Sequence, residues 1–341
     1  MRNIILGKTG IEAPQNGFGA LPIQRVTKAE AVKLLRTARE GGMTYFDTAR
    51  AYSDSEEKLG AAFEGMRDDL FIATKTHSTT PEGFWKDLET SLKNLRTDHI
   101  DLYQFHCVDQ CWEPGDGSGM YECMVEAKKQ GKILHIGVTA HKLQVAFDCV
   151  GSGLYETMQF PFSYLASEKE KALVQKCKEA GVGFIAMKGL AGGLITNSRA
   201  AMAFISQYDN VMPIWGVQRE QELAEWLSYM KDTPEMTPDI EEFIKGDREA
   251  LAGDFCRGCG YCMPCPAGIM INQCARMSRL LRRAPSKAWL TPEMQAEMKK
   301  IEGCLNCRQC AKKCPYELDT PELLRKNYED YKRVLAGEVA V

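Results

Sequence analysis

Nine of the 14 cysteines lie within residues 256–314, and eight of them form two short runs that each end immediately before a proline. The second run has a C-x2-C-x2-C-x3-C spacing, formed by Cys304, Cys307, Cys310 and Cys314. Two-residue gaps let a tight turn direct three thiolates at one cubane, and the fourth thiolate then ligates a second cluster. In a cytosolic chain, this many cysteines indicates metal or redox chemistry, because disulfides are disfavoured there.

The first run resembles the second, with a last gap that is one residue shorter. It consists of Cys256, Cys259, Cys262 and Cys265. We predict two [4Fe–4S] clusters with crossed ligands. The first three cysteines of each run would share a cluster with the last cysteine of the other run. Cys274 is a second candidate for the fourth ligand beside the first run.

Structural zinc is the alternative, since paired C-x2-C units also bind that ion. Zinc takes four thiolates per ion, usually from two separated pairs, whereas each run here is continuous and closed by proline. The spacing therefore favours clusters, and free thiols are the remaining alternative. Residues 254–341 hold 15 Lys/Arg against 10 Asp/Glu, an excess that would partly offset anionic clusters.

Residues 1–230 alternate short apolar segments with amphipathic stretches of helical length. The segments that indicate buried parallel strands lie near residues 14–19, 43–47, 70–74, 100–105, 133–138, 156–160, 183–187 and 211–215. The helical stretches are 27–40, 54–65, 83–95, 118–130, 142–150, 167–180, 198–207 and 219–230. Eight such units in about 220 residues predict an α/β fold, a (β/α)8 TIM barrel. A doubly wound sheet is the alternative, but no GxGxxG follows the first strand.

The pattern changes after Met230, where a polar stretch with two prolines begins. We predict a barrel domain over residues 1–230, a linker over 231–252, and a small ferredoxin-like domain over 253–341. A helical stretch at about 274–303 separates the cysteine runs and favours a mainly α-helical ferredoxin over the β-containing type.

The segment YFDTARAY at residues 45–52 resembles the signature of the aldo-keto reductase superfamily. The resemblance covers about residues 1–230 and continues through residues 72–75, 101–106 and 131–138. With the cysteine-rich tail, the chain is similar to the iron–sulfur branch of that superfamily. The resemblance implies four catalytic positions: Asp47, Tyr52, Lys75 and His106.

These four residue types suit the reduction of a carbonyl. Three of them sit at the ends of predicted strands, where a barrel places its chemistry. A tyrosine with a pKa of about 10 is a weak proton donor, and we expect the ammonium of Lys75 to lower the pKa of Tyr52. Asp47 would hold Lys75, and His106 would orient the substrate oxygen. Taken singly, these residues have plainer explanations: a helix cap, a solvated lysine and a core histidine.

The same resemblance implies contacts to a nicotinamide cofactor. These residues are Gly19, Thr139, Gln159, Lys188, Gly189, Leu190, Gly192 and Glu222. Gln159 and Thr139 match contacts to the nicotinamide amide. The loop Lys188–Gly193 matches the one that holds the pyrophosphate, and its glycines would allow close backbone approach. An ordinary βα turn is the alternative for this loop.

The nucleotide preference depends on the segment after the eighth predicted strand. NADPH-specific members of the superfamily place basic residues there, whereas the matching positions in this chain are Gly216 and Glu222. Glu222 would repel a 2′-phosphate and accept a ribose hydroxyl, although Arg219 is near enough to bind a phosphate. NADH is therefore slightly favoured over NADPH. A barrel without nicotinamide remains an alternative, and no flavin motif is evident.

We predict an oxidoreductase that interconverts a small-molecule carbonyl and an alcohol, with two [4Fe–4S] clusters that exchange electrons with a partner protein. Hydride transfer moves two electrons whereas a cubane passes one, so a carrier that splits electron pairs is needed to join them. Two other readings stay open. In one, the chain is an electron-transfer protein with the barrel as scaffold, and in the other, the clusters of a reductase are only structural.

The bulk properties exclude several other classes. The formal net charge is −3, with 44% hydrophobic and 26% charged residues, as in soluble globular proteins. This charge gives no attraction to nucleic acid or to an acidic membrane. Apolar runs are too short for a membrane-spanning helix or a secretory signal. We expect a cytoplasmic protein from an anaerobic or low-oxygen organism.

Overall fold

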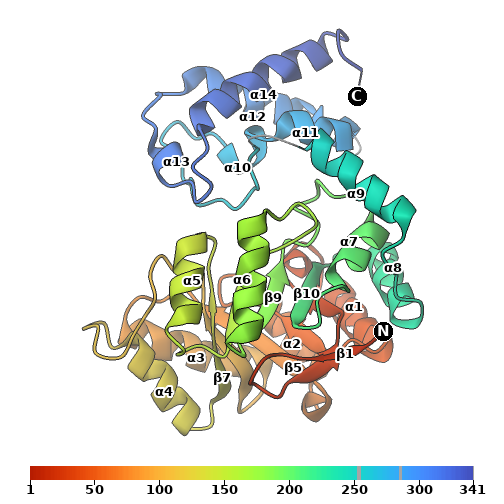
Figure 1. Ribbon diagram of the computed structural model, residues 1–341. Helices are drawn as coiled ribbons and strands as arrows, with labels where there is room; N and C mark the ends of the chain where they lie inside the picture. Colours follow the sequence, from red (N-terminus) through yellow and green to blue (C-terminus); the bar gives the residue numbers. More distant parts are fainter. Residues whose placement is uncertain (252–254, 284–285, 341) are drawn as a thin grey trace. The chain divides into compact units, whose positions relative to one another are not determined.

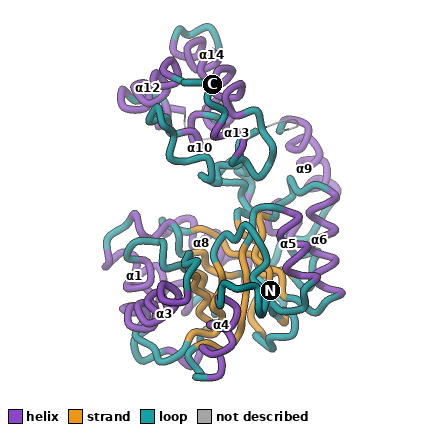
Figure 2. The backbone as a smooth tube through the Cα atoms, turned by 90° about the vertical axis from the view of Figure 1, so that its left-hand side faces the viewer, coloured by secondary structure: helices purple, strands orange, loops and turns teal. Residues whose placement is uncertain are grey.

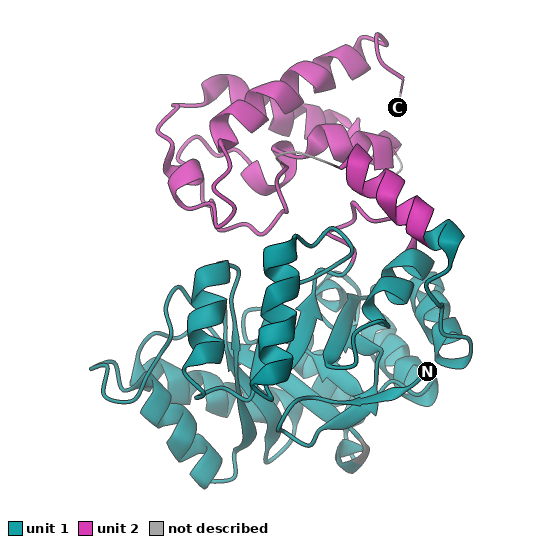
Figure 3. Cartoon of the chain, in the orientation of Figure 1, with its two compact units in different colours: residues 1–189, 198–240 teal, residues 190–197, 241–341 magenta. Residues whose placement is uncertain are grey.

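A computed structural model describes residues 1–251, 255–283 and 286–340. The chain divides into two compact units (Figure 3). The first combines Met1–Gly189 with Ser198–Ile240, and the second combines Leu190–Asn197 with Glu241–Val341. The division on the C-terminal side therefore falls within a helix, α9 (Pro238–Ala250), in the stretch that was expected to be a linker.

The first unit contains a closed barrel of eight parallel strands, which confirms the predicted fold class (Figure 1). The strands are β3 (Gly17–Gly19), β4 (Tyr45–Asp47), β5 (Phe71–Thr76), β6 (Ile100–Phe105), β7 (Ile133–Thr139), β8 (Thr157–Pro161), β9 (Gly183–Met187) and β10 (Val211–Gly216). Each pairs with the next along the chain, and β10 closes the barrel against β3. The carboxyl ends of all eight strands therefore meet at one rim.

Helices alternate with these strands and surround them (Figure 2). They are α1 (Lys28–Glu40), α2 (Ser55–Phe63), α3 (Pro81–Leu95), α4 (Met120–Lys129), α5 (Leu143–Gly151), α6 (Glu168–Glu179), α7 (Ser198–Ile205) and α8 (Glu220–Lys231). Short 3-10 turns lie at Pro22–Arg25 and Arg67–Asp69. Thr27 and Ser167 begin α1 and α6 with reciprocal capping boxes, which satisfy backbone N–H groups that the helix itself leaves unpaired.

A hairpin that the sequence did not predict precedes the barrel. Strands β1 (Asn3–Ile5) and β2 (Glu12–Pro14) pair antiparallel, and Gly7 bridges to Val182, the residue before β9. Ile4, Leu6, Ile11 and Ala13 join one core cluster with barrel residues such as Tyr45 and Met212. The hairpin thus covers the amino-terminal end of the strands, which leaves the opposite rim for chemistry.

The second unit consists of helices and loops in its described residues, as expected of a mainly helical domain. After α9 come α10 (Ile271–Cys274), α11 (Met277–Arg283), α12 (Pro292–Lys299), α13 (Gln309–Lys312) and α14 (Thr320–Leu335), with 3-10 turns at Ser286–Trp289 and Lys300–Gly303. The expected helical stretch 274–303 is therefore interrupted. Pro292 at the start of α12 and the Thr291 cap begin a new helix there. Across the described residues of both units, no helix is both long and apolar enough to cross a membrane.

Helix α14 organises the packing of this unit. Its buried face carries Leu324, Asn327 and Tyr331. The Asn327 amide donates to Ala275 O at 3.1 Å and accepts from Ser278 N at 2.8 Å, which ties α14 to the start of α11. The Tyr331 hydroxyl donates to a backbone carbonyl at 2.8 Å. The loops that carry the cysteine runs are thus attached to a helical support.

We predict that Gly60→Ala destabilises the protein by about 1–3 kcal/mol, because a Cβ at Gly60 would lie 2.1 Å from the Asn94 carbonyl oxygen, a backbone atom that has little freedom to move. The matched control is Gly151→Ala at the end of α5, where a Cβ meets nothing within 4 Å. The midpoint of thermal unfolding should fall for the first variant and stay constant or rise for the second. Equal midpoints would contradict the close packing of α2 on α3.

Candidate active site and cluster sites

The barrel strands bring several of the predicted site residues to neighbouring positions. Asp47 ends β4 and pairs in register with Gly19 of β3. Lys75 of β5 pairs with Gln104 of β6. Thr139, the last residue of β7, pairs with Gln159 of β8. His106 directly follows β6. The parallel register therefore places these side chains at the carboxyl ends of the strands.

A buried ion pair lies at the centre of this group. Lys75 Nζ donates to Asp47 Oδ1 at 2.6 Å and to the Thr48 carbonyl at 2.6 Å. Both side chains are buried, with 0% and 2% of their surface exposed. Burial raises the pKa of Asp47, and the Lys75 ammonium opposes this shift. Removing either partner would leave an uncompensated buried charge, which costs about 3–5 kcal/mol.

Gln104 extends this pair into a network and was not singled out as a site residue. Its amide Nε2 donates to Gln159 Oε1 at 3.1 Å and lies 3.5 Å from Asp47 Oδ2. Gln104 is fully buried. The sequence signal that could have identified Gln104 is its place between two aromatic residues at the end of a buried strand. A buried glutamine needs hydrogen-bond partners within the protein.

Tyr52 lies between Lys75 and His106. Lys75 Nζ is 5.4 Å from the centroid of the Tyr52 ring. The rings of Tyr52 and His106 meet edge to face, with centroids 5.7 Å apart. The structure thus brings together all four residues that the resemblance implied, from three strand ends and one loop.

The expected lowering of the Tyr52 pKa is wrong for this structure. Burial raises the pKa of Tyr52, and the charges of Asp47 and Cys107 raise it further. The main physical reason is burial, which disfavours the charged phenolate, while Lys75 directs its hydrogen bonds to Asp47 and Thr48. Tyr52 therefore keeps its proton at neutral pH, which is the form that a proton donor requires.

His106 is held as a neutral imidazole. Burial lowers its pKa well below the usual value, and the nearby Lys75, His77 and His141 lower it further. Its ring stacks on that of His77, with centroids 3.9 Å apart and planes 20° apart. His77 is not among the site residues that the sequence predicts, although its place just beyond the end of β5 is a signal for a residue at the rim.

Glu56 of α2, four residues after Tyr52, has a structural role. Its buried carboxylate accepts hydrogen bonds from the Thr74 and Ser91 hydroxyls, each at 2.7 Å, and it forms an ion pair with Arg50. These contacts join α2, α3 and β5. Through its ion pair with Arg50, Glu56 thereby fixes the loop that carries Tyr52.

Several predicted nicotinamide contacts already have local partners. Thr139 Oγ1 accepts from the Cys107 backbone at 2.6 Å, and Gln159 binds Gln104. A Cβ at Gly19 would lie 3.1 Å from the Trp215 carbonyl oxygen, and one at Gly189 would lie 2.4 Å from the Trp215 ring. Packing against Trp215 thus requires both glycines irrespective of a cofactor.

The loop Lys188–Gly193 is divided between the two compact units. Lys188 and Gly189 belong to the first unit, whereas Leu190 and Gly192 belong to the second. Within the second unit, the Gly192 carbonyl accepts a hydrogen bond from Arg276 at 3.0 Å.

Glu222 lies in the first turn of α8, where its carboxylate caps the helix. Oε2 accepts from the backbone N–H groups of Gln218 and Arg219 at 2.9 and 3.0 Å. Oε1 accepts from Arg219 Nε at 2.8 Å. The charge of Glu222 is thus partly offset by Arg219. The acidic and the basic residue that bear on nucleotide preference form one ion pair.

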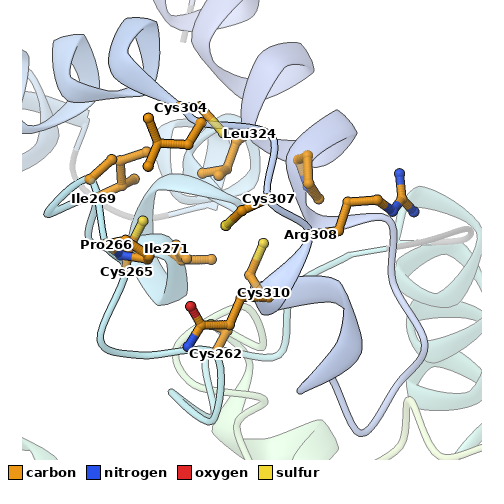
Figure 4. Close-up of a pocket in the computed structure, with 14 residues that line it drawn as sticks. Cys262, Cys265, Pro266, Ile269, Ile271, Cys304, Cys307, Arg308, Cys310 and Leu324 are labelled. Carbon is orange, nitrogen blue, oxygen red and sulfur yellow. The ribbon is translucent and has the colours of Figure 1, made fainter.

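Two pockets in the second unit gather cysteines from both runs. The first is lined by Cys256, Cys259, Cys262 and Cys314. The second is lined by Cys265, Cys304, Cys307 and Cys310, and Cys262 also borders it (Figure 4). These are the two crossed sets that the spacing predicts, so the donor residues fit a pair of [4Fe–4S] clusters.

Cys274 lines neither pocket. It is fully buried, and burial raises the pKa of its thiol to about 12. Among the described residues, no group of three or more His, Cys, Asp or Glu side chains is close enough to hold a single metal ion.

Comparison with known proteins assigns the chain to a family. Residues 6–207 match the model of the aldo/keto reductase family, and residues 255–319 match that of a 4Fe-4S dicluster domain. The chain belongs to the aldo/keto reductase family, with a 4Fe-4S dicluster domain in its C-terminal part. This confirms the resemblance seen in the sequence.

Two relatives from Bacillus subtilis illustrate the similarity. Aldo-keto reductase YhdN is 30% identical over 211 residues, which cover 56% of this chain and 62% of the relative. The uncharacterized oxidoreductase YqkF is 27% identical over 269 residues, which cover 74% and 83%. The chain thus spans about three fifths of the length of YhdN.

Among solved structures, the aldo-keto reductase AKR11C1 from Bacillus halodurans in its holo form superposes with a TM-score of 0.64 at 20% identity, over 72% of this chain and 96% of that one. An aldo-keto reductase from Klebsiella pneumoniae in complex with NADPH gives a TM-score of 0.61 at 18% identity, over 72% and 95%. At such identities these similarities show a shared barrel fold.

We predict that Cys314→Ala lowers the iron content of the anaerobically prepared protein by about four atoms per chain, because it removes one ligand of the first pocket. The matched control is Cys274→Ala, which removes a buried thiol that lines neither pocket. Iron and acid-labile sulfide are counted after anaerobic reconstitution. Full iron content in Cys314→Ala together with loss in Cys274→Ala would show that the fourth ligand is Cys274.

Proposed function

We propose that the protein is an oxidoreductase that interconverts a carbonyl and an alcohol with a nicotinamide nucleotide as hydride carrier. The observation that supports this best is the convergence of Tyr52, Lys75 and His106 at the barrel rim, with Asp47 holding Lys75. A tyrosine that retains its proton beside a buried ammonium and a neutral imidazole matches the needs of carbonyl reduction.

Each residue has a separate task in this proposal. When bound, the nicotinamide supplies the hydride. Tyr52 gives its proton to the oxygen that gains negative charge, and Lys75 stabilises the phenolate that remains, because its ammonium lies over the ring. Neutral His106 donates a hydrogen bond to the same oxygen. Asp47 holds Lys75 in place within the buried site through their ion pair.

We further propose that the second unit carries two [4Fe–4S] clusters, one in each cysteine pocket. The first would be held by Cys256, Cys259, Cys262 and Cys314, and the second by Cys265, Cys304, Cys307 and Cys310. When bound, such clusters supply one-electron transfer, here to or from a partner protein. We retain the proposed division into a barrel domain over residues 1–230, a linker over 231–252 and a ferredoxin-like domain over 253–341.

We also propose a low-oxygen environment, because an exposed cysteine such as Cys307 is open to oxidation.

We also propose a preference for NADH over NADPH. The support is the carboxylate of Glu222 in the first turn of α8, where a 2′-phosphate would meet a negative charge. Its ion pair with Arg219 weakens this repulsion without removing it, since both charges stay partly exposed to solvent. The preference is therefore expected to be modest.

We predict that Tyr52→Phe lowers kcat/KM for carbonyl reduction by about 10²–10⁴-fold, because it removes the proton donor. Tyr328→Phe is the matched control, since that tyrosine lies on α14 and donates to Glu302 at the surface. Both variants should keep the visible absorbance of the clusters. Unchanged turnover in Tyr52→Phe would remove Tyr52 from the proposed chemistry.

We predict that Glu222→Gln narrows the difference between the dissociation constants of NADH and NADPH. Glutamine at this position still accepts hydrogen bonds from the backbone of Gln218 and Arg219, so α8 keeps its cap while the negative charge disappears. Fluorescence titrations with both nucleotides measure the change. A parent protein that binds NADPH more tightly than NADH would refute the proposed preference.

A further inference from the structure

A second, wider hollow lies in the C-terminal unit, apart from the two cysteine pockets. It is formed by residues of α9, α11 and α14 together with Thr196, Phe255, Ala275 and Arg276. We call it the basic groove, because arginines are its most frequent lining residues. Its charged lining residues are Asp247, Arg276, Arg279, Arg282, Arg283, Lys326 and Asp330.

The described lining of the basic groove carries an excess of positive charge, with five cationic side chains against two carboxylates. This excess contrasts with the formal net charge of −3 for the whole chain. A local concentration of one charge sign in a concave surface strengthens the field there and attracts partners of the opposite sign. The groove therefore suits an anionic partner.

Most of the guanidinium groups of the basic groove are held by hydrogen bonds within the protein. Arg282 makes a two-pronged pair with Asp330 at 2.6 and 2.8 Å. Arg283 binds Asp247 at 2.5 Å and the Leu194 carbonyl at 3.2 Å. A phosphate ligand would need such guanidinium forks for itself. The groove is thus better suited to a broad anionic surface than to tight binding of a single phosphate.

Aromatic side chains add a second feature of protein interfaces. Phe243 of α9 lines the groove with 41% of its surface exposed. The ring of Phe255, which also lines it, contacts the guanidinium groups of Arg257 and Arg279, which are 4.8 and 5.0 Å from its centroid. Arginine and phenylalanine are enriched where proteins bind one another.

The basic groove shares a wall with the first cysteine pocket. Phe255 lines the groove, and Cys256, the next residue, lines the pocket. Arg276 also lines the groove, and its guanidinium packs so closely on Gly258 that a Cβ there would lie 2.9 Å from Cζ. A partner seated in the groove would therefore be close to a cluster in that pocket.

We propose that the basic groove docks an acidic one-electron carrier protein, which exchanges electrons with the cluster held by Cys256, Cys259, Cys262 and Cys314. In each exchange one electron passes from the reduced carrier to the oxidised cluster, and the carrier is oxidised by one electron. The reverse transfer is balanced in the same way. This inference rests on the proposed function, because it requires a redox-active cluster in the first pocket.

The test compares two charge reversals on α14. Lys326→Glu changes a groove residue whose side chain is 71% exposed, so folding should tolerate the change. Lys332→Glu is the matched control, because it makes the same change in net charge on the same helix and its side chain, 48% exposed, does not line the groove. The probe is an acidic flavodoxin, titrated onto the anaerobic, cluster-loaded protein at several salt concentrations.

We expect Lys326→Glu to weaken flavodoxin binding about tenfold at low salt and to reduce its salt dependence, whereas Lys332→Glu stays close to the parent. Arg279→Gln, which removes one charge from the groove without adding another, should weaken binding by a smaller factor. Equal effects of the two reversals, or no binding to the parent protein, would overturn the docking proposal. Displacement of flavodoxin by millimolar inorganic phosphate or ATP at constant ionic strength would also overturn it, in favour of a small-anion site.

A chemical reductant separates this proposal from the proposed function. Dithionite should bleach the clusters in the parent and in both α14 variants alike. If dithionite reduces the clusters while flavodoxin fails to bind, the docking proposal is wrong and the clusters keep their proposed redox role. If dithionite leaves the clusters unreduced, the proposed electron transfer fails, and with it the exchange assigned to the groove.

Discussion

The buried ion pair between Lys75 and Asp47 is the interaction on which the candidate active site depends. A lysine ammonium without water needs a carboxylate partner, and Asp47 meets this need from the neighbouring strand. Gln104 carries the hydrogen-bond network on to Gln159, so four strands of the barrel contribute to one polar cluster. The barrel can bury these groups only when it is closed, and this links the integrity of the fold to the geometry around Tyr52.

The sequence predicts those features of the fold and of the sites that depend on the periodicity and spacing of nearby residues. Strand and helix periodicity locates the eight barrel strands to within a few residues, since each buried strand is a short apolar run between amphipathic helices. Strand ends then locate Asp47, Lys75 and His106 at one rim, because all strands are parallel. The two cysteine sets follow from spacing in the same way, and the structure assembles both of them as crossed groups.

The parts that the sequence does not predict depend on contacts between distant residues. Strands β1 and β2 have only three residues each, too few for a periodic signal, and their place is set by packing against the barrel. The raised pKa of Tyr52 follows mainly from its burial in the folded barrel and then from the nearby charge of Asp47. Likewise, the position of Glu222 in the sequence indicates a nucleotide contact, and the structure shows that its carboxylate also caps α8.

The crossing of the cysteine sets has a consequence for how the chain matures. Each pocket draws thiols from both ends of a segment that runs from Cys256 to Cys314. In the proposed arrangement of two clusters, the second pocket lacks its full set of thiols until the ribosome has passed Cys310, and the first pocket lacks its set until the ribosome has passed Cys314. The helices between the runs must then bring the two loops together before either proposed centre is complete, which would make delivery of the inorganic cofactor a late event in the life of the polypeptide.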